Sequence, residues 1–138
     1  MSTLHFGVLD VAYVEEGRST TTGDVATILE EKYGVMQMFI DLHEDEIGEL
    51  LAHRMAGLIN NVANDRPVPM GDVDFPKVDA QFRDYLDKGE WEKQTGMPTA
   101  AALAGKSKRK KSGKYDGPRP SFVDTGLYQK SFKTWISK

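Results

Sequence analysis

Residues 41–62 read DLHEDEIGELLAHRMAGLINNV and contain the most regular apolar pattern in the chain. Asp41 followed by Glu44 matches a helix capping box, and the acidic first turn favours the positive end of a helix dipole. Apolar residues then recur at helical spacing over about four turns: Ile47, Leu50, Leu51, Met55, Leu58, Ile59 and Val62. We therefore predict a long helix here, ended by a group of asparagines and Pro67.

Shorter elements are predicted before this helix. Leu4, Phe6 and Val8 alternate with smaller or polar residues, which is typical of a strand. Residues 24–32 carry a short apolar stripe and predict a helix that Gly34 would end in a left-handed cap. The apolar run at residues 35–40 then predicts a second strand.

The chain beyond the long helix is more varied. Residues 65–120 form a variable, loop-rich middle with a helical stripe at its centre, made of Val78, Phe82, Tyr85 and Leu86. A short helix is expected at residues 99–104, and residues 105–120 are predicted to be a mobile basic loop. Apolar residues return at 121–138, where we expect a structured C-terminal segment that adds a strand.

This order of elements predicts a single α+β domain over residues 1–138. Its core would be a small, mostly antiparallel sheet packed against one long helix.

Composition and charge limit the function. The chain has no cysteine, which excludes disulfides and thiolate metal ligands, and its start resembles no secretory signal. No apolar run approaches the roughly 20 residues of a membrane span, so no membrane partner is expected. Residues 1–100 hold 8 Lys and Arg against 19 Asp and Glu, whereas residues 101–138 hold 10 against 2. This polarity favours contact between copies or with an acidic partner, although a solvated acidic face is the simpler alternative.

Three sequence patterns suggest chemistry but lack its context. Asp124-Thr125-Gly126 is similar to the catalytic triplet of aspartic proteases, yet only 12 residues follow Gly126. Gly105-Lys106-Ser107 lacks the earlier glycine of a phosphate-binding loop, because Ala100 stands there. The three histidines, His5, His43 and His53, show no metal-ligand spacing. We therefore expect no catalytic residue, cofactor or metal, and interpret Asp124 and Gly126 as turn or cap residues.

A basic run is the most testable candidate site. Its six cations lie within nine residues: Lys106, Lys108, Arg109, Lys110, Lys111 and Lys114. Flexible cations without interleaved aromatics suit phosphate contact without base stacking. The alternatives are a solubilising loop and a contact with an acidic neighbouring subunit.

The segment from Phe122 to Phe132, FVDTGLYQKSF, resembles the C-terminal motif of phage neck and tail-completion proteins, which include relatives of the lambda minor tail protein Z. In that family an apolar-Asp-Thr-Gly stretch, here ending in Asp124, Thr125 and Gly126, precedes a leucine, here Leu127, and leads into a final strand. Residues 6–8 and 24–34 are similar to the family's early strand and short helix. Residues 35–40 stand where the family has a strand rich in proline, although this chain has none there, and residues 65–120 match no part of it.

The resemblance implies a structural virion protein and not an enzyme. It implies a homo-oligomeric ring, six-fold or twelve-fold, at the head-tail junction, acting as a neck, collar, tail-completion or tail-terminator component. Implied partners are further copies, other neck, connector and tail proteins, and genomic DNA in the channel. Assembly would take place in the host cytoplasm. The alternative function is a non-specific nucleic-acid-binding accessory protein that uses the basic run.

Overall fold

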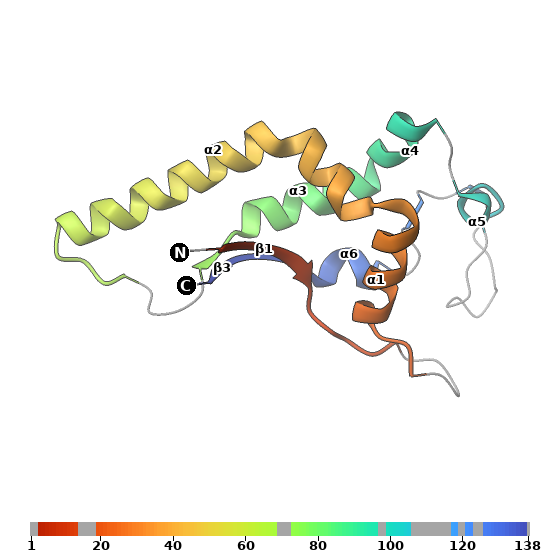
Figure 1. The fold of residues 1–138 in the computed structure, drawn as a ribbon, viewed down its shortest axis with the longest axis horizontal. Coiled ribbons are helices and arrows are strands. Elements are labelled where there is room, and N and C mark those ends of the chain that lie inside the picture. The colour runs from red at the N-terminus through yellow and green to blue at the C-terminus, as the bar shows by residue number, and fades with distance from the viewer. Residues whose placement is uncertain are drawn as a thin grey trace.

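The computed structural model describes residues 3–13, 19–68, 73–96, 99–105, 117–118, 121–122 and 126–137. The elements are, in chain order, β1 (Thr3–Val8), α1 (Thr22–Tyr33), α2 (Val35–Ala63), β2 (Val73–Asp74), α3 (Pro76–Asp87), α4 (Glu90–Thr95), α5 (Ala100–Leu103), α6 (Leu127–Ser131) and β3 (Phe132–Ser137). Figure 1 shows an elongated arrangement in which helices lie over one small sheet. The predicted α+β class is confirmed.

The sheet joins the two ends of the described chain. β3 is its central strand and pairs antiparallel with both β1 and the two-residue β2. Val8 lies opposite Phe132, and Phe6 lies opposite Thr134. Because side chains alternate across a strand, this register puts Phe6 and Val8 on the same face as the buried Phe132 and Thr134. The predicted N-terminal strand and the C-terminal strand pairing are both confirmed.

The core lies between this sheet and α3. The four residues of the predicted stripe on α3, Val78, Phe82, Tyr85 and Leu86, are all buried. Phe82 stacks on Phe132 of β3 with ring centroids 3.9 Å apart, and Phe39 of α2 meets both rings from one side, at 5.2 and 6.0 Å. The sheet therefore packs on α3 and on the start of α2. The predicted packing of the sheet against the long helix is found only at the start of α2, and α3 makes the larger contact with the sheet.

The long helix also begins earlier than predicted. Residues 35–40 are the first turns of α2 and not a strand. Gly34, at φ +58°, ends α1 in the predicted left-handed cap and turns the chain directly into α2. The Glu30 carboxylate then accepts hydrogen bonds from the backbone N–H groups of Met36 and Gln37, at 2.7 and 3.1 Å. These bonds satisfy backbone N–H groups that have no partner within the helix. They replace the side-chain cap that Gly34, at the N-cap position of α2, does not supply.

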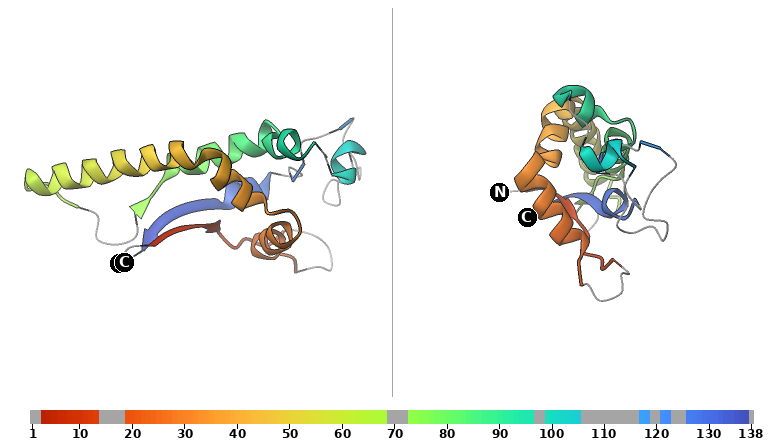
Figure 2. Two further views of the ribbon diagram at one scale, coloured as in Figure 1. Left: turned by 45° about the horizontal axis from the view of Figure 1, so that its top comes forward. Right: turned by 90° about the vertical axis from the view of Figure 1, so that its right-hand side faces the viewer.

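The capping box predicted at Asp41 and Glu44 is also wrong, because the helix begins earlier, at Val35. Asp41 lies inside α2 and accepts a hydrogen bond from the Gln37 side chain. The helix is nevertheless kinked two residues later, where His43 has non-helical angles of φ −119° and ψ 18°. The His43 ring hydrogen-bonds Glu90 at the start of α4, at 2.7 Å. Figure 2 shows the resulting bend and the straight second half of α2 beyond it.

The remaining predictions have mixed outcomes. The long helix ends at Ala63, next to the predicted asparagines, and the short helix at 99–104 is α5 with Thr99 as its cap. Most of residues 105–120, the predicted basic loop, lie outside the described residues.

Candidate interaction surface

The residues that the sequence singled out are only partly described. The basic run, Lys106, Lys108, Arg109, Lys110, Lys111 and Lys114, lies outside the described residues, as do Asp124 and Thr125. Gly126 stands at the N-cap position of α6 with φ +79°, and Leu127 is the first residue of that helix. This left-handed conformation favours glycine, which agrees with the turn or cap role expected of Gly126.

The histidines lie in three different settings. His5 stacks on Trp135 in the sheet, His43 bonds Glu90 at the kink of α2, and His53 lies further along α2. Across the described part of the chain, no group of three or more His, Cys, Asp or Glu side chains could hold a metal ion.

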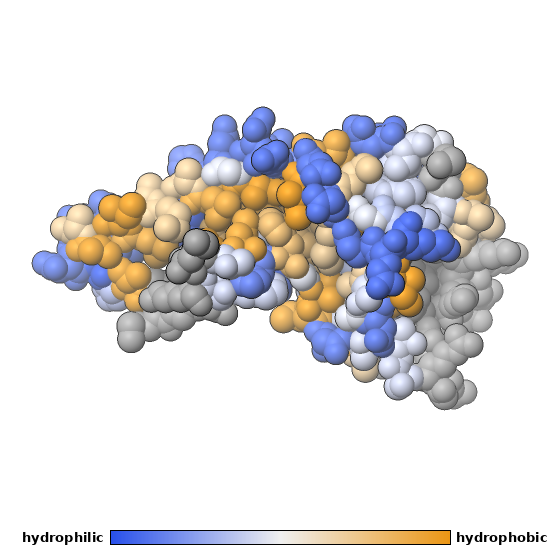
Figure 3. Space-filling view, in the orientation of Figure 1, coloured by the Kyte–Doolittle hydropathy of each residue, from blue (hydrophilic) through white to orange (hydrophobic). Residues whose placement is uncertain are grey.

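The most unusual surface is the second half of α2. Ile47 is buried at the core, but further along the helix Met55, Ile59 and Val62 are exposed to 47%, 66% and 63%. Figure 1 shows this part of α2 extending away from α1, α4 and α5, towards the end of the molecule where the two termini lie. Figure 3 shows apolar side chains gathered at the end where α2 finishes. The predicted apolar stripe exists, but only its first part packs against the molecule.

The last part of α2 also lacks charge. Residues 55–63 read MAGLINNVA and contain no charged side chain, whereas residues 41–49 contain five acidic ones. A solvated helix normally carries charged and polar residues on the face it turns to water. An exposed, uncharged, apolar helix end is typical of a surface that another molecule covers.

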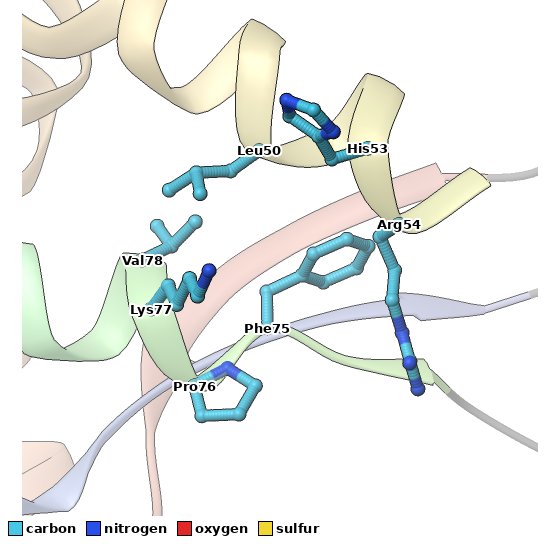
Figure 4. A pocket seen from close by; sticks show the side chains of 7 residues that line it. All are labelled: Leu50, His53, Arg54, Phe75, Pro76, Lys77 and Val78. Atoms are coloured by element: carbon cyan, nitrogen blue, oxygen red, sulfur yellow. The ribbon is translucent and has the colours of Figure 1, made fainter. Parts of the chain in front are cut away.

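A groove lies beside the base of this projecting helix. It has a volume of about 430 Å³, and its lining comes from α2 and the start of α3: Leu50, His53, Arg54, Phe75, Pro76, Lys77 and Val78. Figure 4 shows Leu50 of α2 facing Val78 and Phe75, with Arg54 at one side and the Lys77 side chain between Val78 and Phe75. Neither cation forms an ion pair with any residue in the described ranges. An apolar floor with a cationic rim suits a segment that carries both apolar and acidic side chains.

Sequence reasoning did not find this groove. Its apolar members come from two elements more than 20 positions apart, and Phe75 lies in a stretch predicted to be loop. One local signal does mark this region. Beyond Arg54, residues 55–63 of α2 keep apolar side chains but include no charged one.

Comparison with known protein families, with curated protein sequences and with solved structures gives no match to this chain. No helix within the described ranges combines the length and apolar character needed to cross a membrane.

Proposed function

We propose that the protein is a structural virion subunit of a tailed phage that assembles with further copies into a ring at the head-tail junction. The observation that carries the assembly role is the uncharged end of α2, residues 55–63, with its exposed Met55, Ile59 and Val62. Burying such a surface against a partner would stabilise the assembly by about 25 cal/mol per Å². The phage assignment rests on the resemblance of residues 122–132 to the neck and tail-completion motif.

The groove and the charge polarity support the same role. Arg54 and Lys77 of the groove are basic, whereas residues 1–100 as a whole contain more acidic than basic side chains. Unlike charges on different parts of one subunit favour contacts between different surfaces of neighbouring copies, and such contacts form a ring when the rotation between copies closes. The basic run would then face either the DNA channel or an acidic neighbour.

The test is genetic and structural. In the phage that encodes the chain, a nonsense mutation in its gene is expected to give DNA-filled heads and separate tails in electron micrographs of lysates. The wild-type gene supplied in trans should restore joined particles. Replacing the six basic-run cations by Gln should impair joining while the subunit still folds. Normal joined virions from the nonsense mutant would overturn the proposal.

A matched substitution separates this role from catalysis. Asp124→Asn removes a carboxylate but keeps a side chain that caps helices and turns equally well. We expect this variant to join heads to tails normally. A loss of function with unchanged thermal stability would instead favour a catalytic Asp124.

The accessory nucleic-acid-binding alternative makes a different prediction. It requires the isolated protein to bind duplex DNA with an affinity that falls steeply with salt, since each phosphate contact releases counterions. The basic run and the cationic rim of Arg54 and Lys77 are the features that favour it. Tight binding together with normal virions from the nonsense mutant would select this alternative.

A further inference from the structure

One face of α2 has the spacing of a helix-pairing seam. Its five residues are separated by four, three, four and three positions: Gly48, Ala52, Met55, Ile59 and Val62. All five are exposed along the described helix. Intervals that alternate between three and four are the heptad pattern with which two helices pack side by side. This face differs from the buried one, which starts at Ile47 and turns towards the core.

The side chains on this face increase in size along the helix. Gly48 and Ala52 are small, and Met55, Ile59 and Val62 are large. A Cβ placed on Gly48 would meet no atom within 4 Å, so packing within the subunit gives no reason for a glycine. Glycine inside a helix is about 1 kcal/mol less favourable than alanine. Its presence at the seam is explained if another chain approaches the backbone closely there.

We propose that this face of α2 binds the same face of a second copy, with the two helices antiparallel. In that arrangement, with the two-fold axis at Met55, Gly48 of one helix faces Val62 of the other and Ala52 faces Ile59. Each small residue then meets a large one, and the two Met55 side chains meet at the centre. A parallel pair would put Gly48 opposite Gly48 and leave a gap at one end of the contact.

The charges select the same orientation. Residues 41–49 include five carboxylates, Asp41, Glu44, Asp45, Glu46 and Glu49, and residues 55–63 carry none. A parallel pair brings the two acidic halves together, and like charges in close contact are unfavourable. An antiparallel pair places each acidic half beside the uncharged half of its partner, close to Arg66. Side-chain size and charge therefore both favour a second copy of the chain bound in the antiparallel orientation.

The contact is short. Residues 48–62 span about 21 Å of helix at 1.5 Å per residue, so the interface lies at the small end of specific ones. We expect a dimer that dissociates on dilution. The inference uses the same exposed face of α2 that supports the proposed assembly role. A two-fold pair occupies this face, so contacts around a ring would be made by the groove and other surfaces.

Cysteine cross-linking tests the orientation, because the chain has no cysteine of its own. Ala52→Cys and Ile59→Cys variants, mixed and treated with a short bis-maleimide, should link to each other faster than either links to itself. Glu31→Cys, at an exposed position on α1, is the control for random collision. A mixture that links no faster than this control overturns the dimer. Preferred links of Ala52→Cys to itself overturn the antiparallel orientation.

Sedimentation velocity tests the association itself. Between about 5 and about 500 µM, the wild-type protein should pass from monomer to dimer, and Ile59→Asp should raise the dissociation constant at least about tenfold. Ile28→Asp is the matched control, since Ile28 is 58% exposed on α1 and away from the seam. A wild-type monomer at every concentration overturns the inference. The head-tail joining assay reads the proposed function separately, so the two can fail independently.

Discussion

Phe122 begins the segment on which the phage proposal rests, and its backbone is strained. It has φ +67°, in the left-handed region that a side chain larger than glycine rarely adopts. Its ring packs edge-on to Trp91, with centroids 4.9 Å apart, and lies 5.2 Å from Tyr33. These contacts from α1 and α4 hold the strained residue in place, and so tie the C-terminal segment to the helices.

Two substitutions separate the stability contributed by the Phe122 ring from the cost of its strained backbone. Phe122→Ala should lower the free energy of unfolding by about 2 kcal/mol, because the half-buried ring is lost. Phe122→Gly loses the same ring but relieves a left-handed strain of about 1 kcal/mol. We therefore expect the Gly variant to be at least as stable as the Ala variant in urea denaturation, the reverse of the usual order. An Ala variant more stable than the Gly variant by about 1 kcal/mol would contradict the strain.

Asp79 is a second residue whose native environment is unfavourable for stability. It is only 4% exposed on α3, and its Oδ1 has no hydrogen-bond partner among the described residues. Burial raises the pKa of this carboxyl above its ordinary value of 3.8, and the neighbouring Thr134, Lys133 and Arg83 oppose the shift without cancelling it. The folded protein therefore binds this proton more tightly than the unfolded chain does.

The sign of the pH dependence follows from that difference. At pH 7 the folded state holds a buried charge, and the resulting penalty is relieved as the pH falls through the raised pKa towards 3.8. Asp79→Asn removes the charge at every pH. We expect it to be more stable than the wild type at pH 7, with an advantage that shrinks across this window. Asp84→Asn, at an exposed site on the same helix, should change stability little; an Asp79→Asn variant less stable at pH 7 would show that the carboxylate is needed.

At the scale of elements, the junction of α1 and α2 depends on Glu30. Its carboxylate accepts from two backbone N–H groups at the start of α2, where the helix dipole also favours negative charge. Glu30→Ala should therefore lower the free energy of unfolding by about 1 to 2 kcal/mol in denaturant titrations. Glu31→Ala, at the adjacent exposed position, is the control and should have little effect. Equal effects of the two substitutions would show that Glu30 acts only through its general charge.

The start of α2 also shows which parts of the fold could be predicted from the sequence and which could not. Elements with a local signal were predicted correctly: the alternation of β1, the stripe of α3 and the left-handed cap at Gly34. The strand predicted at 35–40 was wrong because the start of α2 is buried on several sides and its cap comes from the preceding helix. A short apolar run with buried or half-buried residues on several sides has too little periodicity to separate helix from strand. The groove at Arg54 and Phe75 depends on tertiary placement and could not be predicted locally.

At the scale of the whole molecule, stability should be distributed unevenly. The two ends of the chain meet in the sheet, where β3 lies between β1 and β2, and the aromatic core covers this pairing. The second half of α2 has no comparable cover, since most of its residues from Ala52 onward are exposed. Regions with few buried contacts open locally at lower free energy than the core does.

Hydrogen exchange can measure this difference and connect it with the proposed dimer. In a dilute sample, backbone amides of residues 55–63 should exchange well before those around Phe39 and Phe82, because a solitary helix end frays while core helices open only with the whole fold. Raising the protein concentration should slow exchange in residues 48–62 of the wild type, since pairing with a second copy opposes fraying. The Ile59→Asp variant should show no such dependence. Uniform protection along all of α2 in dilute wild-type protein would mean that the projecting half is stabilised within the subunit, and that its apolar face needs no partner.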